Sequence, residues 1–134
     1  LSMSEIFYSS EAALHGFDRA AQERNFEASL TGALPVRCLM LEEEDGTCLG
    51  YGIVCHSWSS ELGGPMILAE ELYLKPEARG RGLASGYFRW LFQEYEGRAA
   101  GFRLEVAPEN AWVMDIYKKH GFGPLEYIQM IKVL

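Results

Sequence analysis

The chain has 134 residues, of which 49% are hydrophobic and 23% charged, a balance typical of one globular domain over residues 1–134. A net charge of −7 argues against a nucleic-acid partner, because proteins of that class neutralise phosphates with Lys and Arg. No apolar run reaches the roughly 18 residues of a membrane helix. Three cysteines and three histidines without metal-ligand spacing, and no visible leader, predict a metal-free cytosolic protein without a membrane partner.

The first third of the chain reads as helical. Ser9 or Ser10 can cap a helix that continues through residues 12–21, and Asn25 can cap a second, shorter helix. Gly32 follows that second helix at the place where a glycine commonly ends one. The sequence therefore predicts two helices before residue 35.

Strand patterns follow. Residues 36–43, 48–58 and 66–74 are rich in β-branched and apolar residues, and Asp45–Gly46 is a hairpin turn signal between the first two. The connections are short, so the three strands are expected to form an antiparallel meander.

The second half alternates between helix and strand. Apolar residues recur at helical spacing over residues 83–95, and residues 101–107 read as a strand parallel to the one before it. A second helix starts near Asn110, and residues 126–134 read as a final strand. The predicted fold class is α/β, with a mixed central sheet.

One loop between strand and helix carries a phosphate-binding pattern. Helix N-termini offer unpaired N–H groups, and the glycines of "RGRGLAS" (Arg79–Ser85) permit a close approach to them. The P-loop spacing is absent, because Leu83 and Ala84 follow the glycines. A dinucleotide fingerprint is nearly matched, but five residues, "KPEAR" (Lys75–Arg79), separate the strand from the first glycine, and a meander precedes it.

A third type of loop fits better. The R-x-x-G-x-A pattern at Arg79–Ala84 resembles the coenzyme A pyrophosphate loop of the GNAT superfamily of N-acetyltransferases. "NAWVMDIYKKHGF" (Asn110–Phe122) is similar to that family's second motif, at the expected distance. The resemblance covers about residues 36–134. It implies a V-shaped splay between the strands at 66–74 and 101–107.

The resemblance also implies roles for individual residues. Pantetheine would lie along the strand, nearest Leu72, Tyr73 and Leu74, and Asn110 would reach it from the start of its helix. The pyrophosphate of acetyl-coenzyme A would be held by the loop and the start of its helix, at Arg79, Gly80, Arg81, Gly82, Leu83, Ala84 and Ser85.

Two further residues are candidates for the chemistry. The resemblance makes Tyr117 the general acid, whereas its helical position alone favours core packing. Glu70 matches a glutamate nine positions before the loop arginine in polyamine-type members. This match makes it a candidate base, and an acid facing solvent is an equally good interpretation. If no bulge interrupts the strand, Glu70 shares a face with Leu68 and Leu72.

The resemblance implies an acetyl-coenzyme A-dependent N-acetyltransferase acting on a small polyamine-like or amino-acid-like primary amine, by direct attack in a ternary complex. A protein N-terminus or lysine as acceptor, or a non-catalytic coenzyme A-binding module, remain as alternatives. The N-terminal part, residues 1–35, is shorter than in many members. A missing first strand would leave a sheet edge that a second copy could cover, forming a homodimer.

Overall fold

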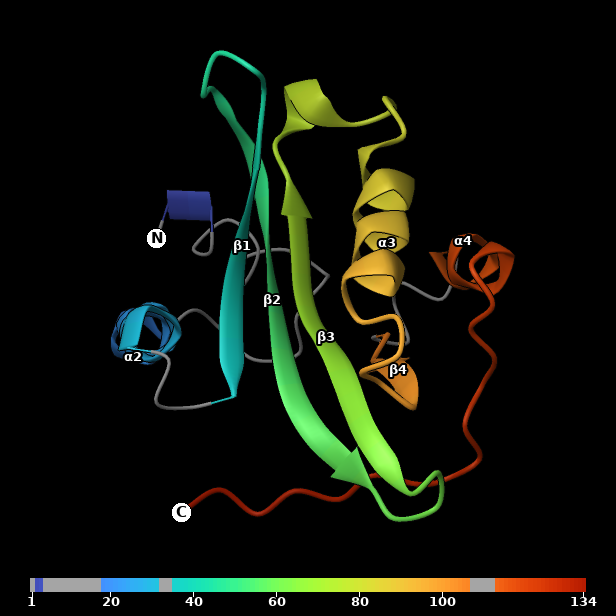
Figure 1. Cartoon of the computed structure of the whole chain (residues 1–134). Helices are drawn as coiled ribbons and strands as arrows, with labels where there is room; N and C mark the ends of the chain where they lie inside the picture. Colours follow the sequence, from blue (N-terminus) through green and yellow to red (C-terminus); the bar gives the residue numbers. More distant parts are fainter. Residues whose placement is uncertain (1, 4–17, 32–34, 107–112) are drawn as a thin grey trace.

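The computed structural model describes residues 2–3, 18–31, 35–106 and 113–134. A four-stranded sheet in the order β1-β2-β3-β4 separates α2 on one face from α3 and α4 on the other (Figure 1). Within the described residues, no helix is long and apolar enough to cross a membrane. The elements, in chain order, are α2 (Arg19–Thr31), β1 (Val36–Glu42), β2 (Cys48–Ser59), β3 (Gly64–Leu74), η1 (Pro76–Ala78), α3 (Leu83–Glu94), β4 (Gly101–Leu104) and α4 (Met114–Lys119).

The predicted meander and the parallel strand after it are confirmed. β1 pairs antiparallel with β2 and β2 with β3, whereas β3 pairs with β4 in parallel. The hairpin turn between β1 and β2 contains Gly46 at a φ of 88°, a left-handed conformation that favours glycine. The side chain of Asp45 accepts a hydrogen bond from the N–H of Thr47, at 2.9 Å, and completes this turn.

The predicted start of a helix at Asn25 is wrong. α2 runs without a break through Asn25, whose side chain donates to Gln22 within the same helix, at 3.3 Å. Asp18 supplies the cap instead, because its carboxylate accepts a hydrogen bond from the N–H of Ala21, at 3.1 Å. The candidate caps Ser9 and Ser10 lie outside the described residues.

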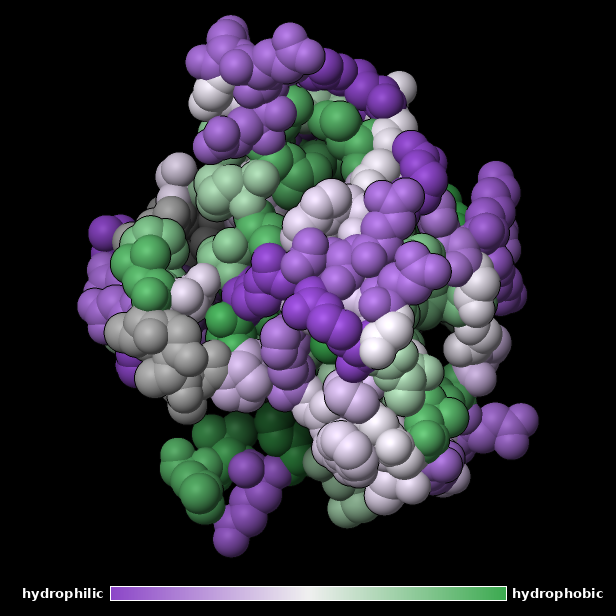
Figure 2. Space-filling model, viewed as in Figure 1, coloured by the Kyte–Doolittle hydropathy of each residue, from purple (hydrophilic) through white to green (hydrophobic). Residues whose placement is uncertain are grey.

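The predicted final strand at residues 126–134 is not formed. This segment belongs to no helix or strand, and its apolar side chains are exposed, as the green atoms at the lower left of Figure 2 illustrate. Its alternating pattern is typical of a strand, but a strand forms only where a neighbour supplies backbone hydrogen bonds. Within the described residues, the segment is tied to the domain through Tyr127, whose hydroxyl donates to Glu61.

α3 covers one face of the sheet with an aromatic cluster. Phe88 of α3 is 2% exposed and lies at the centre of this cluster, where it meets α4 and the segment after α4. Ring centroids lie within 6.3 Å of that of Phe88 for Tyr87, Phe92, Tyr117, His120 and Phe122. Buried aromatic pairs of this kind stabilise the packing beyond the area they remove from water.

The far end of α3 is fixed to the sheet by polar contacts. The guanidinium of Arg37 on β1 donates to the hydroxyl of Tyr95 at 2.9 Å and lies 3.5 Å from the carboxylate of Glu94. His56 on β2 also contacts that hydroxyl through its Nε2 atom. Partial desolvation, followed by the charges of Arg37 and Arg98, lowers the pKa of His56, so its ring is neutral at pH 7.

Close packing between α3 and β2 requires a glycine at position 52. A Cβ atom there would lie 2.3 Å from the hydroxyl oxygen of Tyr87. We expect Gly52→Ala to lower the free energy of unfolding by about 1–3 kcal/mol, because the buried ring must shift to accommodate the methyl group. Urea denaturation measures this difference.

Gly123→Ala is the matched control, since no atom lies within 4 Å of the Cβ it would introduce. Combining Gly52→Ala with Tyr87→Leu should cause less destabilisation than the sum of the two single substitutions, because the clash is then removed. Equal destabilisation by Gly52→Ala and Gly123→Ala would show that the clash with Tyr87 is not the cause.

Candidate cofactor and acceptor site

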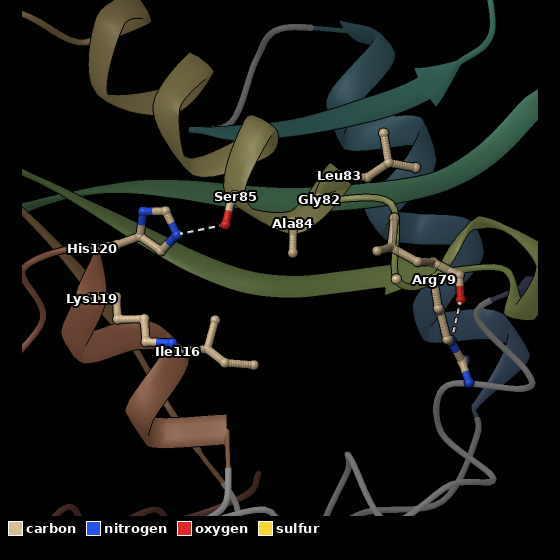
Figure 3. Close-up of a pocket in the computed structure, with 10 residues that line it drawn as sticks. Arg79, Gly82, Leu83, Ala84, Ser85, Ile116, Lys119 and His120 are labelled. Atoms are coloured by element: carbon tan, nitrogen blue, oxygen red, sulfur yellow. Dashed lines mark hydrogen bonds between the residues drawn. The ribbon is translucent and has the colours of Figure 1, made fainter.

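One candidate site lies at the start of α3. A cavity of about 460 Å³ opens between the glycine loop, the first turn of α3 and the C-terminal turn of α4 (Figure 3). Eight of its lining residues are labelled in that view, and the full lining consists of Leu74, Arg79, Gly80, Gly82, Leu83, Ala84, Ser85, Ile116, Lys119 and His120. Six of the residues that the sequence predicts for the loop therefore line one cavity.

The backbone of this loop fits a phosphate. Gly80 and Gly82 have φ angles of 74° and 76°, and no atom lies within 4 Å of a Cβ built at either position. Among the described residues, no side chain caps α3, so the first N–H groups of the helix are left for an external acceptor. Unpaired N–H groups and the positive end of the helix dipole together suit an anionic group such as a pyrophosphate.

The two loop arginines are engaged elsewhere. The guanidinium of Arg81 lies 2.8 Å from the carboxylate of Glu43, and Arg81 does not line the cavity. Arg79 donates from Nε to the carbonyl oxygen of Leu74, at 3.0 Å. Its guanidinium carbon also lies 5.7 Å from the centroid of the Tyr73 ring. Both side chains stabilise the loop in this conformation.

Among the described residues, no strand pairs with the edge of β3 next to the cavity. Parallel pairing with β4 covers four residues of β3, Met66–Ala69, and β3 continues to Leu74. Leu72 packs into the core beneath α3, Tyr73 is buried on the opposite face, and Leu74 lines the cavity. The splay between the two strands, which the resemblance implies, corresponds to this point of separation.

A β-bulge at the same point interrupts the alternation that would place Glu70 on one face with Leu68 and Leu72. Ile53 of β2 pairs with Glu71 and Val54 pairs with Ala69, which leaves Glu70 without a partner in β2. The extra residue reverses the alternation of side chains beyond it. Glu71, and not Glu70, is consequently buried on the α2 face, at 6% exposure.

Glu70 lies on the exposed side of the bulge, near two charged residues of the β4 segment. Partial desolvation is the largest cause that raises the pKa of its carboxyl above the ordinary value of 4.5, followed by repulsion from Glu105. Arg103 opposes both effects. A raised pKa brings a carboxylate closer to the range in which it accepts protons near neutral pH.

A second cavity, of about 250 Å³, lies on the other face of the sheet. It is formed by α2, β1 and β2, and its lining is mostly apolar: Met3, Gln22, Asn25, Phe26, Cys38, Met40, Tyr51 and Ile53. The hydroxyl of Tyr51 donates to the carboxylate of Glu71 at 3.2 Å, which places that acid beside the cavity wall. The site therefore has an apolar hollow next to a buried carboxylate.

Of the two remaining predicted residues, one can be placed. Asn110 lies outside the described residues. Tyr117 packs in the aromatic cluster, with its ring centroid 5.7 Å from that of Phe88, and does not line the cofactor cavity. Among the described residues its hydroxyl has no hydrogen-bond partner, and partial burial raises its pKa, which keeps the phenol protonated.

Three residues near the two cavities are not assigned to the site by sequence alone. In the sequence pattern, Lys119 and His120 complement the α4 dipole. The structure shows that both also line the cavity at the start of α3. His120 Nε2 lies 3.0 Å from the hydroxyl oxygen of Ser85. The third residue, Glu71, is buried because of the bulge, which the pairing of β3 with β2 determines. The burial of Glu71 is therefore evident only from the pairing between β2 and β3.

Known proteins resemble the chain in sequence. The family model described as "Acetyltransferase (GNAT) family" matches residues 3–122. A curated thialysine N-epsilon-acetyltransferase of Bos taurus is 34% identical over 92 residues, 63% of this chain and 54% of the relative. The chain thus spans about half the length of the curated relatives it matches.

Solved structures share the fold. A chain described as a possible acetyltransferase of Clostridium difficile 630 has a TM-score of 0.80 at 15% identity, over 98% of this chain and 86% of the other. An acetyltransferase of Trypanosoma brucei has a TM-score of 0.69 at 13% identity, over 98% and 90%. At these identities the likeness concerns the fold alone.

The raised pKa of Glu70 predicts a pH-dependent stability difference. The folded state disfavours the ionised carboxylate, so Glu70→Gln should stabilise the protein at about pH 7. As the pH falls through the folded-state pKa towards the ordinary value of 4.5, the wild type regains that stability and the difference should shrink. Urea midpoints at about pH 7 and about pH 4 measure the change.

Glu105→Gln removes the neighbouring charge, so Glu70→Gln should stabilise that variant less than it stabilises the wild type at about pH 7. A Glu70→Gln variant that is less stable than the wild type at about pH 7 would contradict a raised pKa at this position.

Proposed function

The chain belongs to the GNAT acetyltransferase family, and on that premise we propose that it transfers an acetyl group from acetyl-coenzyme A to a primary amine. The observation that carries this proposal is the uncapped start of α3 behind two left-handed glycines, beside the unpaired edge of β3. The coenzyme supplies the acetyl group as a thioester and leaves as a thiol.

We propose that the coenzyme lies on the loop side of the sheet. The N–H groups of Gly80–Ser85 would hold its pyrophosphate. The unpaired edge of β3 from Glu70 to Leu74 would supply backbone groups to the pantetheine, because unpaired strand groups require hydrogen-bond partners. Asn110, just before α4, would complete this binding.

The acceptor amine would enter from the α2 face. The apolar cavity there can take an aliphatic chain, and Glu71 beside it can attract an ammonium group. The curated relatives are named for a thialysine N-ε-amine, which is a primary amine at the end of a flexible chain. A small amino-acid-like or polyamine-like acceptor is thus our proposal.

The chain's own residues would move two protons. Glu70, with its raised pKa, would accept a proton from the incoming ammonium, which makes the nitrogen lone pair available for direct attack in the ternary complex. Tyr117 would donate a hydrogen bond or a proton to the departing sulfur. The raised pKa of this phenol weakens it as an acid, so stabilisation of developing negative charge is its principal effect.

The function is tested by incubating the protein with acetyl-coenzyme A and a panel of amines while free thiol is measured. The panel contains thialysine, lysine, spermidine and a peptide with a free N-terminus. We expect thiol release that depends on one of the small amines. Release with the peptide alone would redirect the proposal to protein acceptors, and coenzyme binding without release would indicate a non-catalytic module.

Replacing Tyr117 by Phe should lower kcat by about a hundredfold or more, because the hydroxyl no longer stabilises the departing sulfur. Coenzyme affinity, measured by calorimetry, should not change. Tyr127→Phe in the exposed C-terminal segment is the matched control and should retain full activity. An unchanged rate in the Tyr117→Phe variant would exclude this residue as the acid.

The two neighbouring acids should give separable kinetic effects. We expect Glu71→Gln to raise KM for the amine about tenfold or more, because a charged hydrogen-bond acceptor is lost from the acceptor side. Glu70→Gln should lower kcat and flatten the acidic limb of the pH–rate profile. Melting temperatures identify any variant that has lost its fold. The reverse assignment, with kcat lost in Glu71→Gln, would overturn these two roles.

A further inference from the structure

Of the two arginines in the glycine loop, Arg79 lines the cavity but is engaged by neighbouring groups, and Arg81 does not line it. Arg81 is paired with Glu43 at 2.8 Å and is absent from the cavity lining. Arg79 bonds to the backbone of Leu74, stacks over Tyr73, and lies across the cavity from Lys119 in Figure 3. A phosphate in the cavity would therefore gain from a further side-chain cation on another element.

Helix α4 supplies such a cation, Lys119. It is the last residue of α4, it lines the cavity, and no described residue forms an ion pair or a hydrogen bond with its ammonium. Figure 3 shows its side chain running beside Ile116, in the direction of the loop. Both Lys119 and the preceding lysine, Lys118, are exposed, but only Lys119 lines the cavity.

Packing fixes the end of α4 that carries this lysine against the start of α3. The ring nitrogen of His120 lies 3.0 Å from the hydroxyl oxygen of Ser85 on the first turn of α3. The His120 ring also lies 5.6 Å from that of Phe88, centroid to centroid. The backbone of Lys119 is thus held in place by its neighbour's contacts with α3, which reduces the entropy lost when its ammonium binds a ligand.

Electrostatics favours an anion between these groups. The positive end of the α3 dipole and the ammonium of Lys119 face one cavity, in a chain whose net charge is −7. Resting on the proposed function, we propose that Lys119 is the side-chain cation that binds a phosphate group of the coenzyme, while Arg79 and Arg81 maintain the loop. The chemistry recognised is a phosphate, which the coenzyme carries both in its pyrophosphate and on its ribose.

Calorimetric titration with coenzyme A tests the assignment without depending on activity. Lys119→Gln should weaken binding about tenfold or more, because a charge-assisted hydrogen bond is lost. The salt dependence of binding should also become shallower, since one cation fewer contacts the ligand. Lys118→Gln removes the same charge one residue away and should retain the affinity of the wild type.

Titration with 3′-dephospho-coenzyme A distinguishes the two phosphates. If Lys119 binds the ribose phosphate, its replacement should have no effect on the affinity for this analogue. If it binds the pyrophosphate, the loss should be the same for both ligands. Either result supports the assignment.

Two results would overturn the assignment. One is an unchanged affinity in Lys119→Gln, and the other is an equal loss in Lys118→Gln, which would show a general charge effect. A wild-type protein that does not bind coenzyme A at all would instead reject the proposed cofactor, and the Lys119 assignment with it. Melting temperatures of the variants show that they remain folded.

Discussion

The arrangement of the site depends on where β3 stops pairing with β4. Parallel hydrogen bonding ends at Ala69, and the next residue, Glu70, is the extra residue of a bulge against β2. From this point β3 keeps one partner strand instead of two, and its side chains exchange faces. The unpaired edge leads directly to the glycine loop, and the exchange of faces places Glu71 on the side of α2. One local irregularity therefore determines both halves of the candidate site.

α3 is held firmly at one end and left open at the other. Its C-terminal half is fixed by Tyr95, which contacts Arg37 and His56 on two different strands. Its middle is buried around Phe88, where aromatic rings from α4 and beyond converge. Its first turn carries no side-chain cap, so the backbone donors there are available for a ligand. Stability comes from the part of the helix that is remote from the cavity.

Local patterns in the sequence predicted most of the fold. The alternation in β1, β2 and β3, the turn at Asp45–Gly46 and the helical spacing in α3 all depend on neighbouring residues, and each is confirmed. The features that local patterns do not predict depend on contacts between distant residues. The bulge at Glu70 arises from the register with β2, and the final strand at residues 126–134 has no partner among the described residues that would form it.

The same distinction applies to the site. The glycine loop was recognisable from its sequence pattern. Its two glycines have positive φ angles, which depend on local backbone geometry and favour glycine. Sequence alone could not show that Glu43 would engage Arg81, since 38 positions (81 minus 43) separate the two residues of this ion pair. Lys119 and His120 belong to a motif that was identified, yet their approach to the loop depends on how α4 packs against α3.

The position of the two cavities on opposite faces of one sheet has a consequence for kinetic order. The cavity at the glycine loop is lined by residues of α3 and α4, and the second cavity by residues of α2, β1 and β2. The two cavities share no lining residue. If the two cavities bind the coenzyme and the amine, relative affinities and concentrations, and not steric blocking, would set the sequence of binding. An acetylated product could then depart from the α2 face while the spent coenzyme is still bound.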